Sequence, residues 1–187
     1  ALGGTEGRQA LWFAPAGFNR GGLTELTSGI SVSRTALHLV SSDRDALYEV
    51  NINPIATFPN EGVVIFGQKT LQQTPSALDR VNVRRMMFAI EKRIKAESRV
   101  LLFDPHDQAF HDAFIEIARR ILSDVQNQRG LHAFIIKADF ELNTPDVIDR
   151  NEFRARIGVQ PTRAVEFMFI EFSIHRTGSF TENADTF

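Results

Sequence analysis

Two long amphipathic patterns in the middle of the chain constrain the fold more than any other feature of the sequence. In the first, apolar residues recur three or four positions apart: Val83, Met87, Ile90 and Ile94. The second carries a longer stripe of the same kind: Phe110, Phe114, Ile117, Ile121 and Val125. This spacing is typical of an α-helix with one buried face. We therefore expect helices over residues 81–97 and 107–128, both packed on one core.

Runs of apolar and β-branched residues predict strands around these helices. One run lies between Gly62 and Gly67, and another covers residues 131–142. The longest, residues 164–174, is apolar on both faces at its centre, so we expect it in the middle of a sheet. The predicted fold class is α+β, with a mixed β-sheet flanked by two long amphipathic helices and followed by an extended terminal arm.

Shorter elements are expected between these segments. We predict a short helix near residues 42–50, a strand-like run over 100–103, and a short helical piece over 146–156. Gly158 and Pro161 are expected to end that last piece.

The predicted organisation has three parts. Residues 1–45, interrupted by glycine and proline, form an irregular N-terminal segment. Residues 46–175 form the α+β domain, and residues 176–187, which are polar and without periodicity, form an extended C-terminal arm. The chain starts without an initiator Met or a signal pattern, so we expect a piece of a longer protein.

The composition argues against several classes of protein. The chain has no cysteine, which removes disulfides, thiolate zinc sites and thiol nucleophiles. It has no apolar run near the roughly 20 residues of a spanning helix, so no membrane is expected. The net charge is −2, and the basic helix lacks interleaved aromatic residues, so no nucleic acid is expected. Sixteen Phe beside one Tyr and one Trp suit a core or a dry interface.

Charge is distributed unevenly along this nearly neutral chain. Residues 84–97 contain five basic and two acidic residues, whereas residues 139–187 contain nine acids and five arginines. Local excesses of opposite sign allow copies of one chain to dock by complementary patches.

One cluster of side chains invites a chemical interpretation. His106 and His111 lie among Asp104, Asp107 and Asp112, and such residues can hold a divalent metal. On a helix, however, the two histidines are about 140° apart, and the first two aspartates suit helix capping. We therefore expect capping, with no catalytic residue, cofactor or metal. A small metal-dependent hydrolase stays an alternative.

Several stretches, in order along nearly the whole chain, resemble the C-terminal part of contractile-tail sheath proteins of phages and related injection systems. The matching stretches are Trp12–Gly21, Leu47–Tyr48, Ile52–Ile55, Gly62–Gly67 with Thr70–Leu71, Arg80–Arg85, Ile90–Glu91, Asn143–Pro145 and Pro161–Phe172. Phe66 stands where many sheaths have Trp, and the outward-facing domains of a complete sheath subunit are absent.

The resemblance implies a structural subunit that assembles helically around a tail tube and contracts to drive the tube through the host envelope. No enzymatic activity is implied. The expected partners are other sheath subunits, the tail tube protein, and the baseplate and tail terminator proteins. The expected location is the tail of the virion, after assembly in the host cytoplasm.

The resemblance also implies a helix that faces the tube and terminal arms that add strands to neighbouring subunits. We expect Arg119 and Arg120 to contact the tube, with Lys92 and Lys95 as the second choice, and Phe180 and Phe187 to anchor the C-terminal arm.

The other alternative is a binding module that recognises an acidic partner through the basic helix without polymerising.

Overall fold

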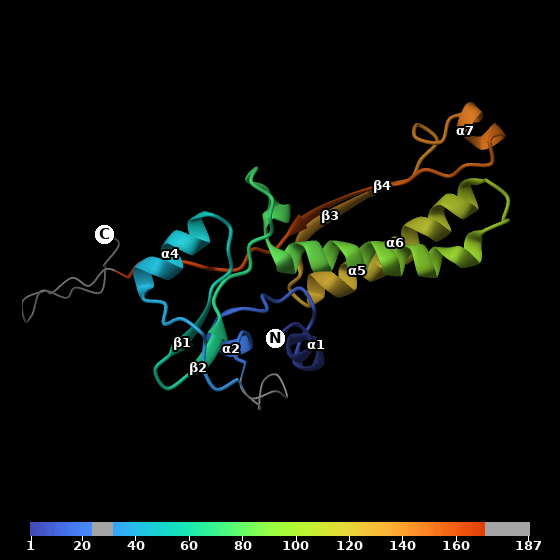
Figure 1. The fold of residues 1–187 in the computed structure, drawn as a ribbon. Coiled ribbons are helices and arrows are strands. Elements are labelled where there is room, and N and C mark those ends of the chain that lie inside the picture. The colour runs from blue at the N-terminus through green and yellow to red at the C-terminus, as the bar shows by residue number, and fades with distance from the viewer. Residues whose placement is uncertain (24–31, 171–187) are drawn as a thin grey trace, which may run out of the picture.

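The computed structural model describes residues 1–23 and 32–170 (Figure 1). Its larger part is a long body made of two helices and a hairpin. Helices α5 (Val81–Glu97) and α6 (Gln108–Asn127) lie side by side and are joined through the short 3-10 helix η2 (Ser98–Leu101). Strands β3 (Leu131–Lys137) and β4 (Arg156–Pro161) pair antiparallel, and β3 packs on α6. Helix α7 (Pro145–Asp149) stands at the far end of this hairpin.

The smaller part contains the first half of the chain. Strands β1 (Ile55–Phe58) and β2 (Gly62–Ile65) form a second antiparallel hairpin, with Ile55 opposite Ile65. Around this hairpin lie the remaining elements: α1 (Leu2–Arg8), α2 (Gly17–Arg20), α4 (Ser41–Glu49) and the 3-10 helix η1 (Ala77–Asp79). No helix in the described ranges is both long and apolar enough to cross a membrane.

The core of the body is the apolar seam between α5, α6 and β3. Its buried side chains are Val83, Met86, Ile90, Ile94, Phe114, Ala118, Ile121, Leu122, Val125, Leu131 and Ala138. The two predicted helices are therefore confirmed, and so are their buried faces in large part. In α6, Phe110 and Ile117 are only partly buried, whereas Ala118 and Leu122 are fully buried. One residue is exchanged in α5. Met86 is buried, whereas Met87 is only partly buried. Both residues satisfy a spacing of three or four from Val83 and Ile90, so the pattern alone could not separate them.

The α+β class is confirmed, but the single mixed sheet is wrong. The structure has two separate two-stranded antiparallel sheets, and residues 62–65 and 131–137 lie in different ones. The partner of β3 is β4, which contains Gly158 and Pro161, where we expected a break. Proline is tolerated there because Pro161 closes an edge strand.

Of residues 164–174, expected in mid-sheet, residues 164–170 instead run largely exposed beyond β4, and residues 171–174 lie outside the described residues. A strand that is apolar on both faces has the same pattern whether its own domain or another chain covers it. Residues 100–103 are also not a strand. They end η2 in a turn where Phe103 has a φ of 75° and is fully exposed.

Candidate assembly surface

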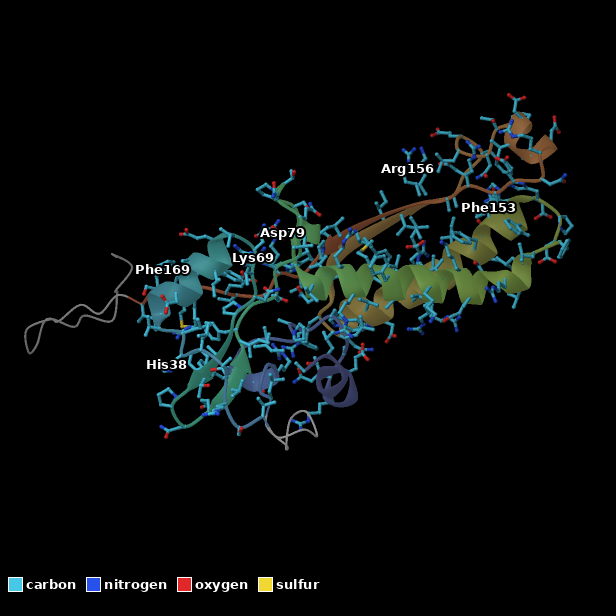
Figure 2. All side chains as sticks on the ribbon, in the orientation of Figure 1. His38, Lys69, Asp79, Phe153, Arg156 and Phe169 are labelled. Carbon is cyan, nitrogen blue, oxygen red and sulfur yellow. The ribbon has the colours of Figure 1, made fainter. Side chains whose placement is uncertain are left out.

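The most unusual surface of the molecule is the extended chain that follows β4. We call residues 163–170 the apolar segment. Five of its side chains are between 65% and 95% exposed: Val165, Phe167, Met168, Phe169 and Ile170. Figure 2 shows Phe169 near α4, well away from the core of the body. A monomeric protein rarely leaves so many large apolar side chains together in water, so this segment has the character of an interface.

The backbone of the apolar segment is as open as its side chains. Thr162 N donates to Gly130 O at 3.0 Å, next to the end of the β3–β4 ladder. Beyond this bond, residues 163–170 form no backbone hydrogen bond with another described residue. An extended segment with free N–H and C=O groups can pair with a strand from another chain.

Glu166 fixes the apolar segment to the rest of the molecule. Its carboxylate accepts two hydrogen bonds from Arg80, at 2.7 Å to Oε1 and 2.9 Å to Oε2. It also accepts hydrogen bonds from the Tyr48 hydroxyl at 2.8 Å and from Gln68 Nε2 at 3.2 Å. We call these four residues the Glu166 clamp. A bidentate arginine–carboxylate pair is both strong and directional, so the clamp sets the position of the segment.

The clamp is an ion pair at neutral pH. Partial burial acts to raise the pKa of the Glu166 carboxyl, but hydrogen bonds from Arg80 and Tyr48 outweigh burial and hold this pKa below its ordinary value. Burial and the adjacent carboxylate raise the pKa of the Tyr48 phenol well above its ordinary value, so Tyr48 stays a donor. The hydrogen bond to Glu166 raises the pKa of Arg80.

The cations expected to contact the tube lie on exposed surfaces of the two long helices. Arg119 and Arg120 are exposed on α6, and Lys92 and Lys95 are exposed on α5. Arg120 pairs across the helices with Glu97, and Lys95 pairs along its own helix with Glu91. Arg119 and Lys92 form no ion pair with a residue that the structure describes. The helices thus tie two of the four cations to their own carboxylates. Phe180 and Phe187 lie outside the described residues.

The two histidines lie closer together than their spacing on a helix predicts. Their Nε2 atoms are 2.8 Å apart, because His106 precedes the first turn of α6 instead of lying within it. His111 is fully buried against the rings of Phe140 and Phe153. Burial and the neighbouring His106 lower the pKa of His111. The two histidines are therefore not held on different sides of a helix, contrary to our prediction.

The capping role predicted for Asp107 is confirmed. Its carboxylate accepts a hydrogen bond from Phe110 N at 2.9 Å at the start of α6. The histidine pair does not extend to a metal-ligating cluster, since the described residues contain no group of three or more histidines and carboxylates arranged to hold a metal ion.

Sequence reasoning missed the Glu166 clamp. Its members are 86 residues apart between Arg80 and Glu166 and 118 apart between Tyr48 and Glu166. The one local signal is a carboxylate in the middle of an apolar run. A charge at such a position needs a partner, but the sequence does not say which.

Comparison with known proteins places the chain in one family. Residues 73–175 match the family described as phage tail sheath C-terminal domain. The tail sheath protein of Vibrio phage KVP40 is 37% identical over 161 residues, which cover 86% of this chain and 23% of that protein. The tail sheath protein of Enterobacteria phage T4 is 31% identical over 175 residues, which cover 94% of this chain and 26% of that protein. The chain thus spans about a quarter of these relatives.

Solved structures share the fold at lower identity. A chain in the cryo-EM structure of the anti-feeding prophage baseplate superposes with a TM-score of 0.82 at 21% identity, covering 94% of this chain and 48% of that one. A chain in the sheath complex of an extracellular contractile injection system, in its contracted state, gives a TM-score of 0.75 at 22% identity, covering 90% and 47%. With the family match over more than half of its length, the chain belongs to the phage tail sheath C-terminal domain family.

Proposed function

We propose that this chain is the tube-proximal part of a contractile tail sheath subunit, a structural and non-enzymatic component that assembles helically around a tail tube. The observation that carries the proposal is the apolar segment, which a solitary subunit leaves in water. Covering a large apolar side chain is worth about 1.5 to 3 kcal/mol. Five such side chains on a backbone free for pairing provide a strong drive toward assembly.

Contraction in this proposal is a change between two lattices of the same subunit. The body, with its continuous core, moves as a rigid unit, and the extended segments keep neighbours connected. The energy released comes from the difference between the two assemblies, so no catalytic group is needed.

The proposed organisation keeps residues 46–175 as the domain and residues 176–187 as an arm that adds a strand to a neighbour, with Phe180 and Phe187 as anchors. The proposed partners are other sheath subunits, the tail tube protein, and the baseplate and tail terminator proteins. The proposed place is the virion tail, following assembly in the host cytoplasm.

For the tube contact, Arg119 and Arg120 remain the proposed pair, with Lys92 and Lys95 second. The exposure of Arg119 and its lack of an ion pair among the described residues support this choice. Charge contacts suit a sheath–tube interface that must separate during contraction, because each exposed ion pair contributes only about 0 to 1 kcal/mol.

The test uses the full-length sheath protein with Phe167→Asp and Phe169→Asp combined. The expected result is a folded, soluble subunit that no longer forms sheaths on tail tubes in electron micrographs, since the two charges prevent burial of the segment. Phe103→Asp is the matched control, because Phe103 is also fully exposed but lies on the turn after η2. Normal sheaths from the double variant would refute the proposal.

A further inference from the structure

A cavity of about 260 Å³ lies where β3 begins and β4 ends. We call it the arginine pocket. Its walls include Trp12, Phe13, Arg20, Asn82, Arg129 and Arg163. The pocket therefore combines residues of the N-terminal segment, the first turn of α5 and the root of the β3–β4 hairpin.

The described residues place no negative charge in this pocket. Its lining contains no acid among residues 1–23 and 32–170, and none of its three arginines forms an ion pair with a described residue. The guanidinium groups of Arg20 and Arg129 lie 5.4 and 5.7 Å from the centre of the Phe13 ring, and Arg20 also donates to two neutral oxygens, Ala14 O and Gln9 Oε1. Three arginines around one cavity, two of them held by the Phe13 ring and none beside a described carboxylate, form a site for an anionic group.

One buried polar group in the wall of the pocket is only partly satisfied. Asn82 is 4% exposed and lines the pocket. Its Nδ2 donates to Trp12 O at 3.1 Å, but its Oδ1 has no partner among the described residues. A buried acceptor without a donor costs about 1 to 3 kcal/mol. Because Oδ1 is inaccessible from the pocket, the ligand is selected by the arginines, which bind carboxylates such as those of an acidic piece of polypeptide.

We propose that the arginine pocket receives the acidic face of α7 from a second copy of this chain. Asp146 and Asp149 of α7 are exposed and form no ion pair with a described residue. They are three positions apart, which places them on the same side of the helix. This inference rests on the proposed function, which brings copies into repeated contact.

The two surfaces cannot meet within one molecule. The pocket lies near the C-terminal end of α6 and α7 lies near its N-terminal end (Figure 1). The 20 residues of α6 separate them by about 30 Å. A contact between one surface and a different surface on the next copy is heterologous, and its repetition builds rings or helical filaments. The contact therefore suits a helical assembly.

The test is a charge exchange in the full-length sheath protein. Arg129→Glu with Arg163→Glu, or Asp146→Lys with Asp149→Lys, should each reduce the sedimentable polymer about tenfold or more, because like charges then face each other. The four substitutions together should restore polymer to near the unmodified amount. Arg156→Glu is the matched control, since Arg156 is exposed on β4 outside the pocket (Figure 2) and should have little effect.

Thermal melting of each variant shows whether a loss of polymer comes from misfolding. In that case Arg129→Gln with Arg163→Gln is used, and its polymer should dissolve at lower salt than the unmodified polymer. A normal amount of polymer from either charge-reversal variant would overturn the inference. A loss of polymer that the four combined substitutions fail to restore would also overturn it. The last result would mean that another acidic partner, such as the tube, occupies the pocket. Absence of sheaths from the unmodified protein would instead refute the proposed function.

Discussion

The two hairpins of this molecule are stabilised in different ways. The β3–β4 hairpin packs on α6, and its buried neighbours come mostly from residues 83–138. The β1–β2 hairpin has no long helix against it, and its face carries the rings of Phe18, Phe58 and Phe66 with Arg44 over them. The body thus depends on a continuous apolar core, whereas the smaller part depends on ring contacts and polar links to distant residues. This difference suits a subunit whose core stays rigid while its connections move.

The largest effect should come from the core of the body. Phe114 is 8% exposed and packs against the Phe153 ring at 4.9 Å. Phe114→Ala should reduce the free energy of unfolding by about 3 to 5 kcal/mol in a denaturant titration. Phe88→Ala on α5 is the control and should change it little, because that ring is largely exposed. A loss below about 1 kcal/mol for Phe114→Ala would mean that the body lacks a rigid core.

The next effect should be local to the smaller part. Arg80→Ala removes both guanidinium hydrogen bonds to Glu166 and leaves a half-buried carboxylate. We expect the free energy of local unfolding to fall by about 1 to 3 kcal/mol. Hydrogen exchange should show it as faster exchange in residues 68–81, where Thr70 N and Val81 N form backbone hydrogen bonds beside Arg80, with residues 108–127 unchanged. Arg150→Ala is the control, because Arg150 and its partner Glu152 are both well exposed. If hydrogen exchange in α6 became faster by the same amount, the two parts would unfold together.

Acid should weaken the far end of the body by a smaller amount. The folded-state pKa of His111 lies below its ordinary 6.5, because of burial and of His106, with Asp112 and Asp139 acting in the opposite direction. The unfolded chain therefore binds more protons than the folded chain in this range. The stability from neutral His111 is present above pH 6.5 and declines as pH falls below it. Melting temperatures between pH 8 and pH 5 should show this decline.

His111→Gln tests the source of that decline. It should flatten the pH dependence of the melting temperature, whereas His38→Gln, on the other part of the molecule, should leave it unchanged (Figure 2). An unaltered pH profile in His111→Gln would mean that acid acts elsewhere.

The smallest effect should come from the ion pairs between the long helices. Arg120→Ala removes the pair with Glu97, but Arg120 is 67% exposed in its side chain and Arg93 still pairs with Glu97. The expected change in unfolding free energy is within about 0.5 kcal/mol. A loss above about 2 kcal/mol would show that the body relies on surface charge as well as on its core.

The sequence predicted those parts of the fold that depend on local periodicity. The bounds of α5 match the expected residues 81–97, and α6 differs by one residue at each end. Pairing could not be predicted in the same way, because β3 joins β4 across 18 residues and a helix, and β4 itself lacks a clear pattern. The residues of the apolar segment were identified as a strand candidate, but the sequence could not show that they lie exposed and pair with no described strand of the domain. The Glu166 clamp depends on contacts too distant for any local signal.

The course of the chain after β4 has a mechanical consequence. The apolar segment continues the line of β4 toward α4 (Figure 1), and the strand is joined to β3 by six residue pairs. A neighbour pulling on this segment would first load the Glu166 ion pair and then draw β4 along its own axis. Tension along a strand loads all of its backbone hydrogen bonds at the same time, whereas tension across the strand breaks them one after another. In the proposed sheath, the β3–β4 hairpin would therefore transmit tension along β4 without opening.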